Sequence, residues 1–465
     1  MEQTLPQLDK KIAFSTIVQY AGKALQLLFS MINLKLISGF LAENDYGIYA
    51  AISEYSLFFS TIANLGIFGN VVRKMADAPK DGKIFFNALV LRMVTLLFFF
   101  IGGVLFLFFS GAEKFFIYGT ILYLGSLFFD NIKSICDGML QANYMMGRAT
   151  AALIAGKAVQ FAGVFLLIKA LGAGGVLASV GTGWGIVLCF LPFLAGSFLM
   201  VLLSFIFING HIVWSFVLDK KMMLAFLLSS LPFGIINIIN NLYFRFLPDY
   251  FANMNLDKAG FASFSVSFRI AQVLSLASTF LMFSVLPGFK NALDGGHYKR
   301  AKKLYGQIKT IILAGGILLV VAGSIASPYL IQLLSHQKYV INDFWFVLPL
   351  MLLLAAVSYG YDLVLITVFA FEKELWFLKR EVMALLIGMG FFTLSFYVPD
   401  VLTRLFLIIV GAIMAESFMV ASGLYEIRKN FQKIIDGKQN GSLLNYSCFG
   451  QLVGLFYTSG RSSVG

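Results

Sequence analysis

The sequence predicts an all-α polytopic membrane protein of about twelve transmembrane helices, in two parallel six-helix lobes around a central cavity. Of its 465 residues, 59% are hydrophobic and only 12% are charged, whereas soluble domains carry about 25% charged residues. The hydrophobic residues form stretches of about twenty residues or more, each long enough to span a bilayer as a helix. Polar residues recur on single faces of several stretches, which indicates a wet interior between helices.

The first stretch, residues 12–37, carries a polar stripe. Its members follow one another at intervals of three and four residues, which places them on one face of a helix. They are Ser15, Gln19, Lys23, Gln26, Ser30 and Asn33. Lys23 lies near the centre of the span, where an ionisable side chain costs roughly 2.5–3.5 kcal/mol and therefore faces a bundle interior or a cavity. We expect this helix to form one wall of the cavity.

Eleven further stretches follow. We expect them at residues 46–68, 84–109, 115–140, 150–171, 172–205, 222–246, 259–287, 301–334, 344–371, 375–398 and 401–427. Residues 206–221 mix aromatic and polar side chains, and we interpret them as an amphipathic connector along the membrane surface. The predicted domains are a six-helix lobe at 1–206, a second at 207–430 that begins with the connector, and a mobile cytoplasmic tail at 431–465.

Basic residues concentrate in alternate loops. The loop after the second span carries Arg73, Lys74, Lys80 and Lys83, whereas the next loop carries only Lys114. Such an asymmetry places the basic loops, and with them both termini, in the cytoplasm. An even number of spans per half makes the two halves parallel repeats.

Polar faces recur in the second, seventh and eighth spans. The candidate substrate-binding residues from these faces and the first stripe are Lys23, Gln26, Asn33, Asn237, Asn241, Arg245, Arg269 and Gln272. A single polar residue in a membrane helix often only bonds to a neighbouring helix, for about 0.6 kcal/mol, and Arg245 is also placed to act as a snorkelling anchor. The recurrence on four helices is what favours a shared, mildly cationic cavity.

Other charged residues lie inside the spans. Asp130, Lys133 and Asp137 on the fourth span have the spacing of an intrahelical ion pair, and Lys157 lies on the fifth. Either a structural role or a substrate contact fits this second cluster. The candidate ion-coupling residues are Glu54, Asp362 and Glu416. Each of these acids either takes up H+ or Na+ or pairs with a buried cation.

The residue pattern predicts neither an enzyme nor a metal site. Three cysteines and three histidines are scattered along the chain, and HExxH, nucleophile-elbow and P-loop motifs are missing. We therefore expect no catalytic residue, cofactor or direct ATP hydrolysis. Nucleic-acid binding is not expected either, because the basic residues outside the spans are not interleaved with aromatic ones.

Several segments, in their order and spacing, resemble the polysaccharide-exporter branch of the MOP superfamily, the Wzx-type flippases of O-antigen and capsule repeat units. They are Leu41-Ala-Glu-Asn-Asp-Tyr-Gly-Ile-Tyr49, Asn64-Leu-Gly-Ile67, Gly138-Met-Leu-Gln-Ala142, Leu231-Pro232 and Val285-Leu-Pro-Gly288. The resemblance covers residues 8–430 and implies the MATE-like fold of that superfamily.

The resemblance implies that a polyprenyl-pyrophosphate-linked oligosaccharide is turned from the cytoplasmic to the outer leaflet of a bacterial inner membrane by alternating access. The product would enter O-antigen, capsule or exopolysaccharide biosynthesis. The implied partners are this lipid-linked oligosaccharide, membrane lipids, H+ or Na+, and a polysaccharide polymerase with its chain-length regulator. An anionic pyrophosphate would need cations such as Lys23 and Arg269 in a low-dielectric interior.

Two other functions stay open. A MATE-type cation-coupled antiporter of drugs or small molecules shares the architecture, and it is expected to have buried acids as the dominant feature of its cavity. A membrane glycosyltransferase or polymerase that uses lipid-linked sugars would need a metal-compatible acidic pair, such as Glu43 and Asp45 in the first outer loop. Such enzymes usually have a larger external loop than residues 248–258 provide, so we expect this pair at an interface or gate.

Overall fold

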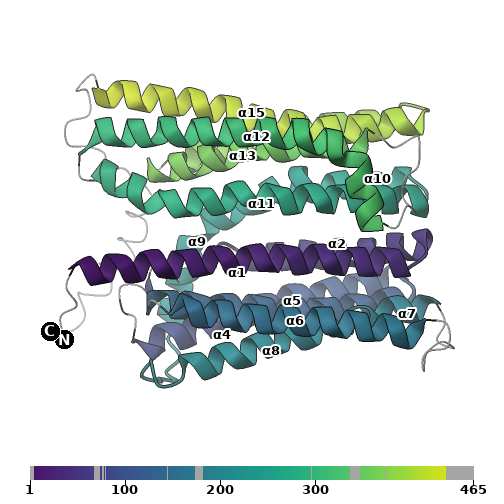
Figure 1. Cartoon of the computed structure of the whole chain (residues 1–465), viewed down its shortest axis with the longest axis horizontal. Helices are drawn as coiled ribbons and strands as arrows, with labels where there is room; N and C mark the ends of the chain where they lie inside the picture. Colours follow the sequence, from purple (N-terminus) through teal and green to yellow (C-terminus); the bar gives the residue numbers. More distant parts are fainter. Residues whose placement is uncertain are drawn as a thin grey trace. The chain divides into compact units, whose positions relative to one another are not determined.

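The computed structural model describes residues 5–67, 74–75, 78, 80–143, 145–172, 182–294, 296–335, 346–371 and 373–435. Helices dominate these residues (Figure 1). They are α1 (Leu5–Phe40), α2 (Glu43–Asn64), α4 (Gly82–Phe109), α5 (Lys114–Ala142), α6 (Met146–Leu171), α7 (Thr182–Leu188), α8 (Leu191–Ile208), α9 (Lys220–Asn241), the π-helix η1 (Leu242–Phe246), α10 (Leu247–Asn255), α11 (Lys258–Asp294), α12 (Tyr298–Ser335), α13 (Val347–Ala370), α14 (Glu374–Ser395) and α15 (Val401–Ile435).

The predicted class, an all-α polytopic membrane protein, is confirmed. Each predicted stretch falls on a helix, and nine helical stretches within the described residues are long and apolar enough to cross a membrane. The mean hydropathy of the apolar part reaches 2.4 in α4 and 2.6 in the stretch that contains α8. Helices α1, α2 and α14 fall outside that set, and these three carry several of the polar residues considered below.

Several details differ from the predictions. The long sixth stretch is interrupted after Leu188, and α8 restarts with Pro192 as its second residue, a position that tolerates proline because its amide needs no helical partner. The predicted connector is not helical between residues 209 and 219. Its backbone is instead attached to the start of α4 through an isolated parallel bridge between Asp81 and Val213. Helix α15 continues to Ile435 with Phe431 buried, so the first five residues of the predicted tail at 431–465 are helical; residues 436–465 lie outside the described part.

Two predicted outer loops are also partly helical. The residues Glu43 and Asp45 lie in the first turn of α2, where the negative charge of Asp45 is favourable to the helix dipole. The segment near Pro248 forms α10, with Asp249 in its first turn. The sequence does not predict these helical turns, because short polar runs between apolar stretches give no helical periodicity.

The chain separates into two compact units. Unit 1 comprises residues 1–230, 256–266 and 328–344, and unit 2 comprises residues 231–255, 267–327 and 345–465. Helices α9, α11 and α12 contribute to both units. Asn237, Asn241 and Arg269 therefore belong to unit 2, and Lys23 belongs to unit 1.

In unit 1, helices α4, α5, α6 and α8 run side by side (Figure 1). Small residues allow α6 and α8 to approach closely: a Cβ atom on Gly156 would lie 2.6 Å from the carbonyl oxygen of Gly196. Beside this crossing, Gln160 donates to Oγ of Ser197 (3.2 Å), and Ser197 bonds to Ser126 of α5 (3.0 Å). Helix α1 packs on α6, where Gly22 faces Thr150.

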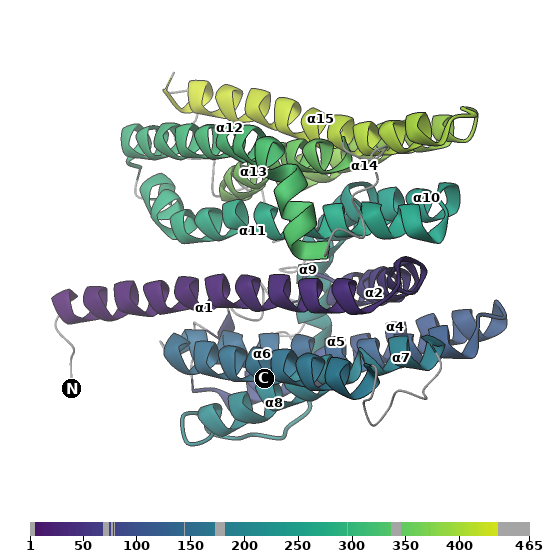
Figure 2. The ribbon, with the colours of Figure 1, turned by 45° about the vertical axis from the view of Figure 1, so that its right-hand side comes forward.

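In unit 2, helix α15 packs against both α13 and α14 (Figure 2). The apolar core between them includes the buried side chains of Val364, Phe377 and Met419. Tyr243 of η1 and Tyr361 of α13 also belong to this core, and their hydroxyl groups bring polar chemistry into it.

Candidate functional site

Unit 1 holds a cluster of charged side chains inside its helices. On α5, Lys133 forms an ion pair with Asp137 one turn later, as the spacing predicted. Lys133 is only 6% exposed, and Oδ1 of Asp137 is buried without a hydrogen-bond partner among the described residues. Burial of an ion pair with one unsatisfied oxygen is costly, so this pair is a candidate for a functional group.

Two lysines from other helices join this pair. Lys23 of α1 is half-buried and interacts electrostatically with Asp137. Lys157 of α6 interacts with Asp130 and Lys133 and donates a 2.9 Å hydrogen bond to Oε1 of Gln160. We define the charged cluster as Lys23, Asp130, Lys133, Asp137 and Lys157. Its three lysines exceed its two aspartates by one positive charge, so it is suited to an anionic group.

The rest of the α1 stripe divides into structural and candidate positions. Ser30 donates to the carbonyl oxygen of Gln26 in the preceding turn (2.9 Å), a local structural role. Asn33 is 3% exposed, and its Oδ1 has no hydrogen-bond partner within the described residues. Gln26 is half-buried. The side chains of Ser15 and Gln19 lie outside the described part.

Glu54 of α2 is 5% exposed and lies in unit 1, and its role in ion coupling stays a prediction. Another buried ionisable residue of unit 1, Arg92 of α4, was not predicted. It is 1% exposed and donates to the carbonyl oxygens of Ala63 (3.1 Å) and Asn64 (3.0 Å) at the end of α2. An arginine at a helix C-terminus satisfies the last carbonyl groups and complements the dipole.

Unit 2 holds a cluster of carboxyl and hydroxyl groups. Glu381 of α14 and Glu416 of α15 are both 0% exposed. Tyr361 donates a 2.5 Å hydrogen bond to Oε1 of Glu381. Asn240 donates to Oε2 of Glu416 (3.4 Å) and to the hydroxyl group of Tyr243 (2.9 Å). We define these five residues as the carboxyl cluster.

Each acid of the carboxyl cluster keeps one unused oxygen. Oε2 of Glu381 and Oε1 of Glu416 have no hydrogen-bond partner among the described residues, and Tyr243 interacts with both acids. Asp362, one residue after Tyr361, accepts a 2.5 Å hydrogen bond from Ser278 of α11. The candidates Asp362 and Glu416 therefore lie in one unit, where Asp362 acts electrostatically on Glu416.

The remaining predicted residues of unit 2 lie on α9, η1 and α11. Asn241 donates to the carbonyl oxygen of Asn237 (2.8 Å) and to its side-chain oxygen (3.1 Å), so these two amides bond along their own helix. Arg245 stacks on Phe246, 5.6 Å from the ring centroid. Arg269 and Gln272 are half-buried, and Nε2 of Gln272 has no partner among the described residues. Because Lys23 and Arg269 belong to different units, their pairing stays a prediction.

A family model described as "Polysaccharide biosynthesis protein" matches residues 8–314, more than half of the chain. The chain belongs to this polysaccharide biosynthesis protein family. No curated protein matches the chain significantly.

Solved structures of MOP-superfamily transporters share the fold of this polysaccharide biosynthesis family member. One is an inward-facing multidrug-resistance MATE transporter, with 14% identity, a TM-score of 0.70, and coverage of 90% of this chain and 99% of that one. Another is a MOP-superfamily transporter from Pyrococcus furiosus, described as having a binding pocket of reverse polarity, with 16% identity, a TM-score of 0.65, and coverage of 93% and 97%. A third is a variant of a Vibrio cholerae MATE transporter, with 12% identity, a TM-score of 0.66, and coverage of 92% and 98%. At these identities the likeness shows that the chain shares the fold of those structures.

Glu381 was missed because it follows Lys379 and Arg380, and the three residues look like one exposed charged segment. The available signal was its spacing to Ala384 and Gly388, which are also buried on α14. Arg92 gave a clearer signal, as an ionisable residue within an apolar run. Among the described residues, no group of three or more histidine, cysteine or acidic side chains is arranged to hold a metal ion.

Proposed function

We propose that this family member is a flippase that moves a polyprenyl-pyrophosphate-linked oligosaccharide from the cytoplasmic to the outer leaflet of a bacterial inner membrane by alternating access. Both termini would lie in the cytoplasm, and the product would serve O-antigen, capsule or exopolysaccharide synthesis. The observation that carries the proposal is the charged cluster of unit 1, with its excess of lysine inside a polysaccharide biosynthesis family protein.

The charged cluster suits a pyrophosphate headgroup. Each lysine of the cluster has a nearby aspartate, so the net charge of the cluster is small. An arriving anion can compete with these aspartates for the ammonium groups. Lys23 is half-buried, whereas Lys133 is only 6% exposed, so an arriving headgroup reaches Lys23 more easily than Lys133. Gln26 and Asn33 on the same helix offer amide groups to sugar hydroxyls. In unit 2, Asn237, Asn241, Arg245, Arg269 and Gln272 are separate candidate substrate-binding residues.

An ion gradient is the proposed driving force. The carboxyl cluster supports this because Glu381 and Glu416 are fully buried, and neither forms an ion pair with a lysine or arginine among the described residues. Buried carboxylates without a counter-charge are strongly disfavoured, so the cluster holds either a proton or a monovalent cation such as Na+. Asp362 and Glu54 are further candidates for this coupling.

Lys23 provides the test of the flippase proposal. Lys23→Met and Lys23→Arg are expressed in a host strain that lacks its own copy of the gene, and surface glycan and lipid-linked oligosaccharide are measured. Lys23→Met is expected to lower surface glycan at least tenfold and to leave the lipid-linked precursor in the inner leaflet, whereas Lys23→Arg keeps partial export. Lys35→Met removes a charge from the same helix outside the charged cluster and serves as the matched control. Normal glycan from a fully inserted Lys23→Met, Arg269→Met double variant would overturn the proposal.

A MATE-type antiporter is the second candidate, favoured by the carboxyl cluster and the fold. It predicts ion-dependent efflux of cationic drugs and unchanged surface glycan after gene deletion. Drug susceptibility and surface glycan in the same deletion strain separate the two functions.

A further inference from the structure

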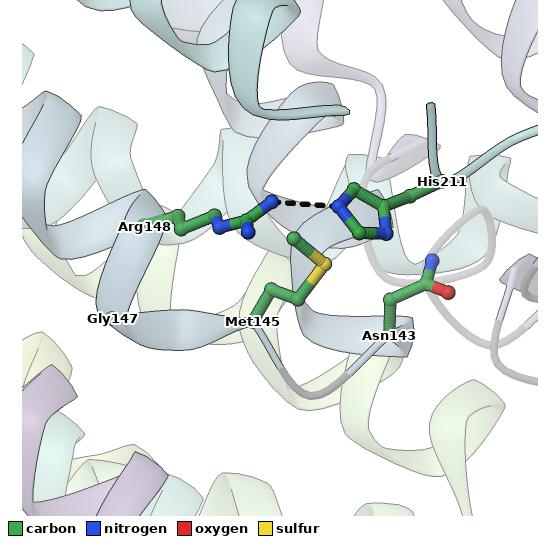
Figure 3. A pocket seen from close by; sticks show the side chains of 5 residues that line it. All are labelled: Asn143, Met145, Gly147, Arg148 and His211. Carbon is green, nitrogen blue, oxygen red and sulfur yellow. Dashed lines mark hydrogen bonds between the residues drawn. The ribbon is translucent and has the colours of Figure 1, made fainter. Parts of the chain in front are cut away.

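A pocket lies in unit 1 where the chain turns from α5 into α6. Its volume is about 380 Å³, and it is lined by Asn143, Met145, Gly147, Arg148 and His211. In Figure 3, Arg148 and His211 point toward one another at the pocket, with Met145 and Asn143 beside them. This pocket is separate from the charged cluster, whose residues do not line it.

Arg148 presents an unused hydrogen-bonding edge at this pocket. Its Nη1 group donates to Nε2 of His211 (2.7 Å) and to the carbonyl oxygen of Phe207 (3.3 Å). Nε and Nη2 have no partner among the described residues, and no carboxylate there forms an ion pair with this guanidinium. The two free groups form the planar fork that binds two oxygens of a phosphate or carboxylate.

His211 adds a second donor. Arginine can only donate, so Nε2 of His211 accepts the bond from Arg148, and the neutral ring carries its proton on Nδ1. Nδ1 has no hydrogen-bond partner among the described residues. A backbone bond from His211 to Ile208 (3.0 Å) fixes the turn that places the ring at the end of α8.

The lining of the pocket includes the charged side chain of Arg148 and no acidic side chain. The amide of Val213, two residues after His211, donates to the carbonyl oxygen of Lys80 (3.1 Å), and Asp81 is bridged to the same residue, so Lys80 and Asp81 together add no net charge. The first turn of α6 adds the partial positive charge of a helix N-terminus. The basic-loop pattern places this end of unit 1 on the cytoplasmic side, where anionic headgroups concentrate.

We propose that this pocket binds a phosphate group through the Nε–Nη2 edge of Arg148 and Nδ1–H of His211. The phosphate is either free in the cytoplasm or the headgroup of a membrane lipid. The open volume beside Arg148 leaves room for the substituent that a phosphate ester carries. The proposal stands independently of the flippase function, because binding at this pocket is measured without transport.

The test uses full-length protein in phosphatidylcholine nanodiscs and two probes. Inorganic pyrophosphate is titrated by calorimetry, and phosphatidate incorporated into the nanodiscs is followed by its retention in native mass spectrometry. For at least one probe, Arg148→Gln is expected to weaken binding at least tenfold, and Arg148→Lys and His211→Phe by several-fold. Lys169→Gln removes an exposed charge from the other end of α6 and is expected to leave binding unchanged.

Pyrophosphate binding that depends on Arg148 assigns the pocket to a soluble phosphate, and Arg148-dependent retention of phosphatidate alone assigns it to a lipid headgroup. The proposal is overturned when neither probe binds, or when every probe that binds does so equally to the wild type and to Arg148→Gln. His211→Phe replaces an exposed side chain on a turn, so it keeps the test valid when Arg148→Gln inserts poorly. Glycan export measured on the same variants shows separately whether translocation is affected.

Discussion

The hydroxyl group of Tyr361 donates a 2.5 Å hydrogen bond to Oε1 of Glu381 in the interior of unit 2. The other oxygen of Glu381 is buried without a partner among the described residues. Glu416, equally buried, has an amide donor in Asn240 and no basic partner there. A buried charge without a counter-charge is costly, and this cost is the reason why we propose that these acids bind a proton or a cation.

Substitution of Glu381 tests this view. Glu381→Gln keeps the size and the acceptor for Tyr361, so the free energy of unfolding is expected to change by less than about 1 kcal/mol. Glu381→Leu leaves the Tyr361 hydroxyl unpaired and is expected to cost about 1–3 kcal/mol. Thermal unfolding in detergent checks both values. Surface glycan, or drug efflux under the antiporter alternative, is expected to fall at least tenfold in Glu381→Gln. Full transport by Glu381→Gln would exclude the carboxyl cluster from ion coupling.

The helices were predictable because hydrophobic length and periodicity directly reflect membrane crossing. The partners of individual charges were not. Sequence spacing put Lys133 and Asp137 on one face of α5, since both lie on the same helix. The proximity of Lys23 and Asp137 depends on how α1, α5 and α6 pack, which no local pattern records. The break after Leu188 and the π-helix at Leu242–Phe246 likewise depend on tertiary packing.

Arg92 is expected to be essential for the stability of unit 1. It satisfies two carbonyl groups at the end of α2, where Leu65 adopts a left-handed conformation (φ 44°). Arg92 also donates to Oδ1 of Asn131 on α5. Arg92→Met leaves these three acceptors without their donor, and we expect at least about 2 kcal/mol of destabilisation. The thermal midpoint of the purified protein measures this loss. Arg300→Met, at an exposed arginine of α12, is the control and is expected to be neutral. Equal midpoints for the two variants would contradict the role assigned to Arg92.

At the crossing of α6 and α8, we expect an alanine to destabilise the protein even though alanine has a higher helix propensity than glycine. A Cβ atom on Gly156 would approach the carbonyl oxygen of Gly196 to 2.6 Å and Cγ of Met200 to 2.2 Å. Gly156→Ala gains up to about 1 kcal/mol of propensity, but the crossing must open, at a cost of about 1–3 kcal/mol. We expect a lower thermal midpoint and lower yield of inserted protein. Gly102→Ala in α4, with nothing within 4 Å of the added carbon, is expected to be neutral or stabilising, and a similar loss in this variant would refute the packing explanation.

Lys83 and Asp219 lead to a pH-dependent prediction at the surface of unit 1. Nζ of Lys83 donates to Oδ2 of Asp219 (2.8 Å), and Oδ1 of Asp219 accepts from the amide of Met222 at the start of α9 (3.0 Å). The hydrogen bond from Lys83, followed by that from Met222, lowers the pKa of Asp219 below its ordinary value. Because the pKa is lower in the folded state, the stabilisation is complete above the unfolded pKa of about 3.9 and is lost as the pH falls through the folded pKa.

Asp219→Asn keeps an acceptor for the amide of Met222 and removes only the charge. We expect it to lower the thermal midpoint at pH 7 and to reduce the dependence of the midpoint on pH below about 4. Lys83→Gln should produce the same change, and the double variant should add little, because both substitutions remove one interaction. Since both side chains are partly exposed, the difference from wild type should also shrink at high salt. A difference in thermal midpoint between wild type and Asp219→Asn that stays constant from pH 7 to pH 3 would contradict this explanation. The attachment of the connector to α4 would then not depend on the charge of the carboxylate.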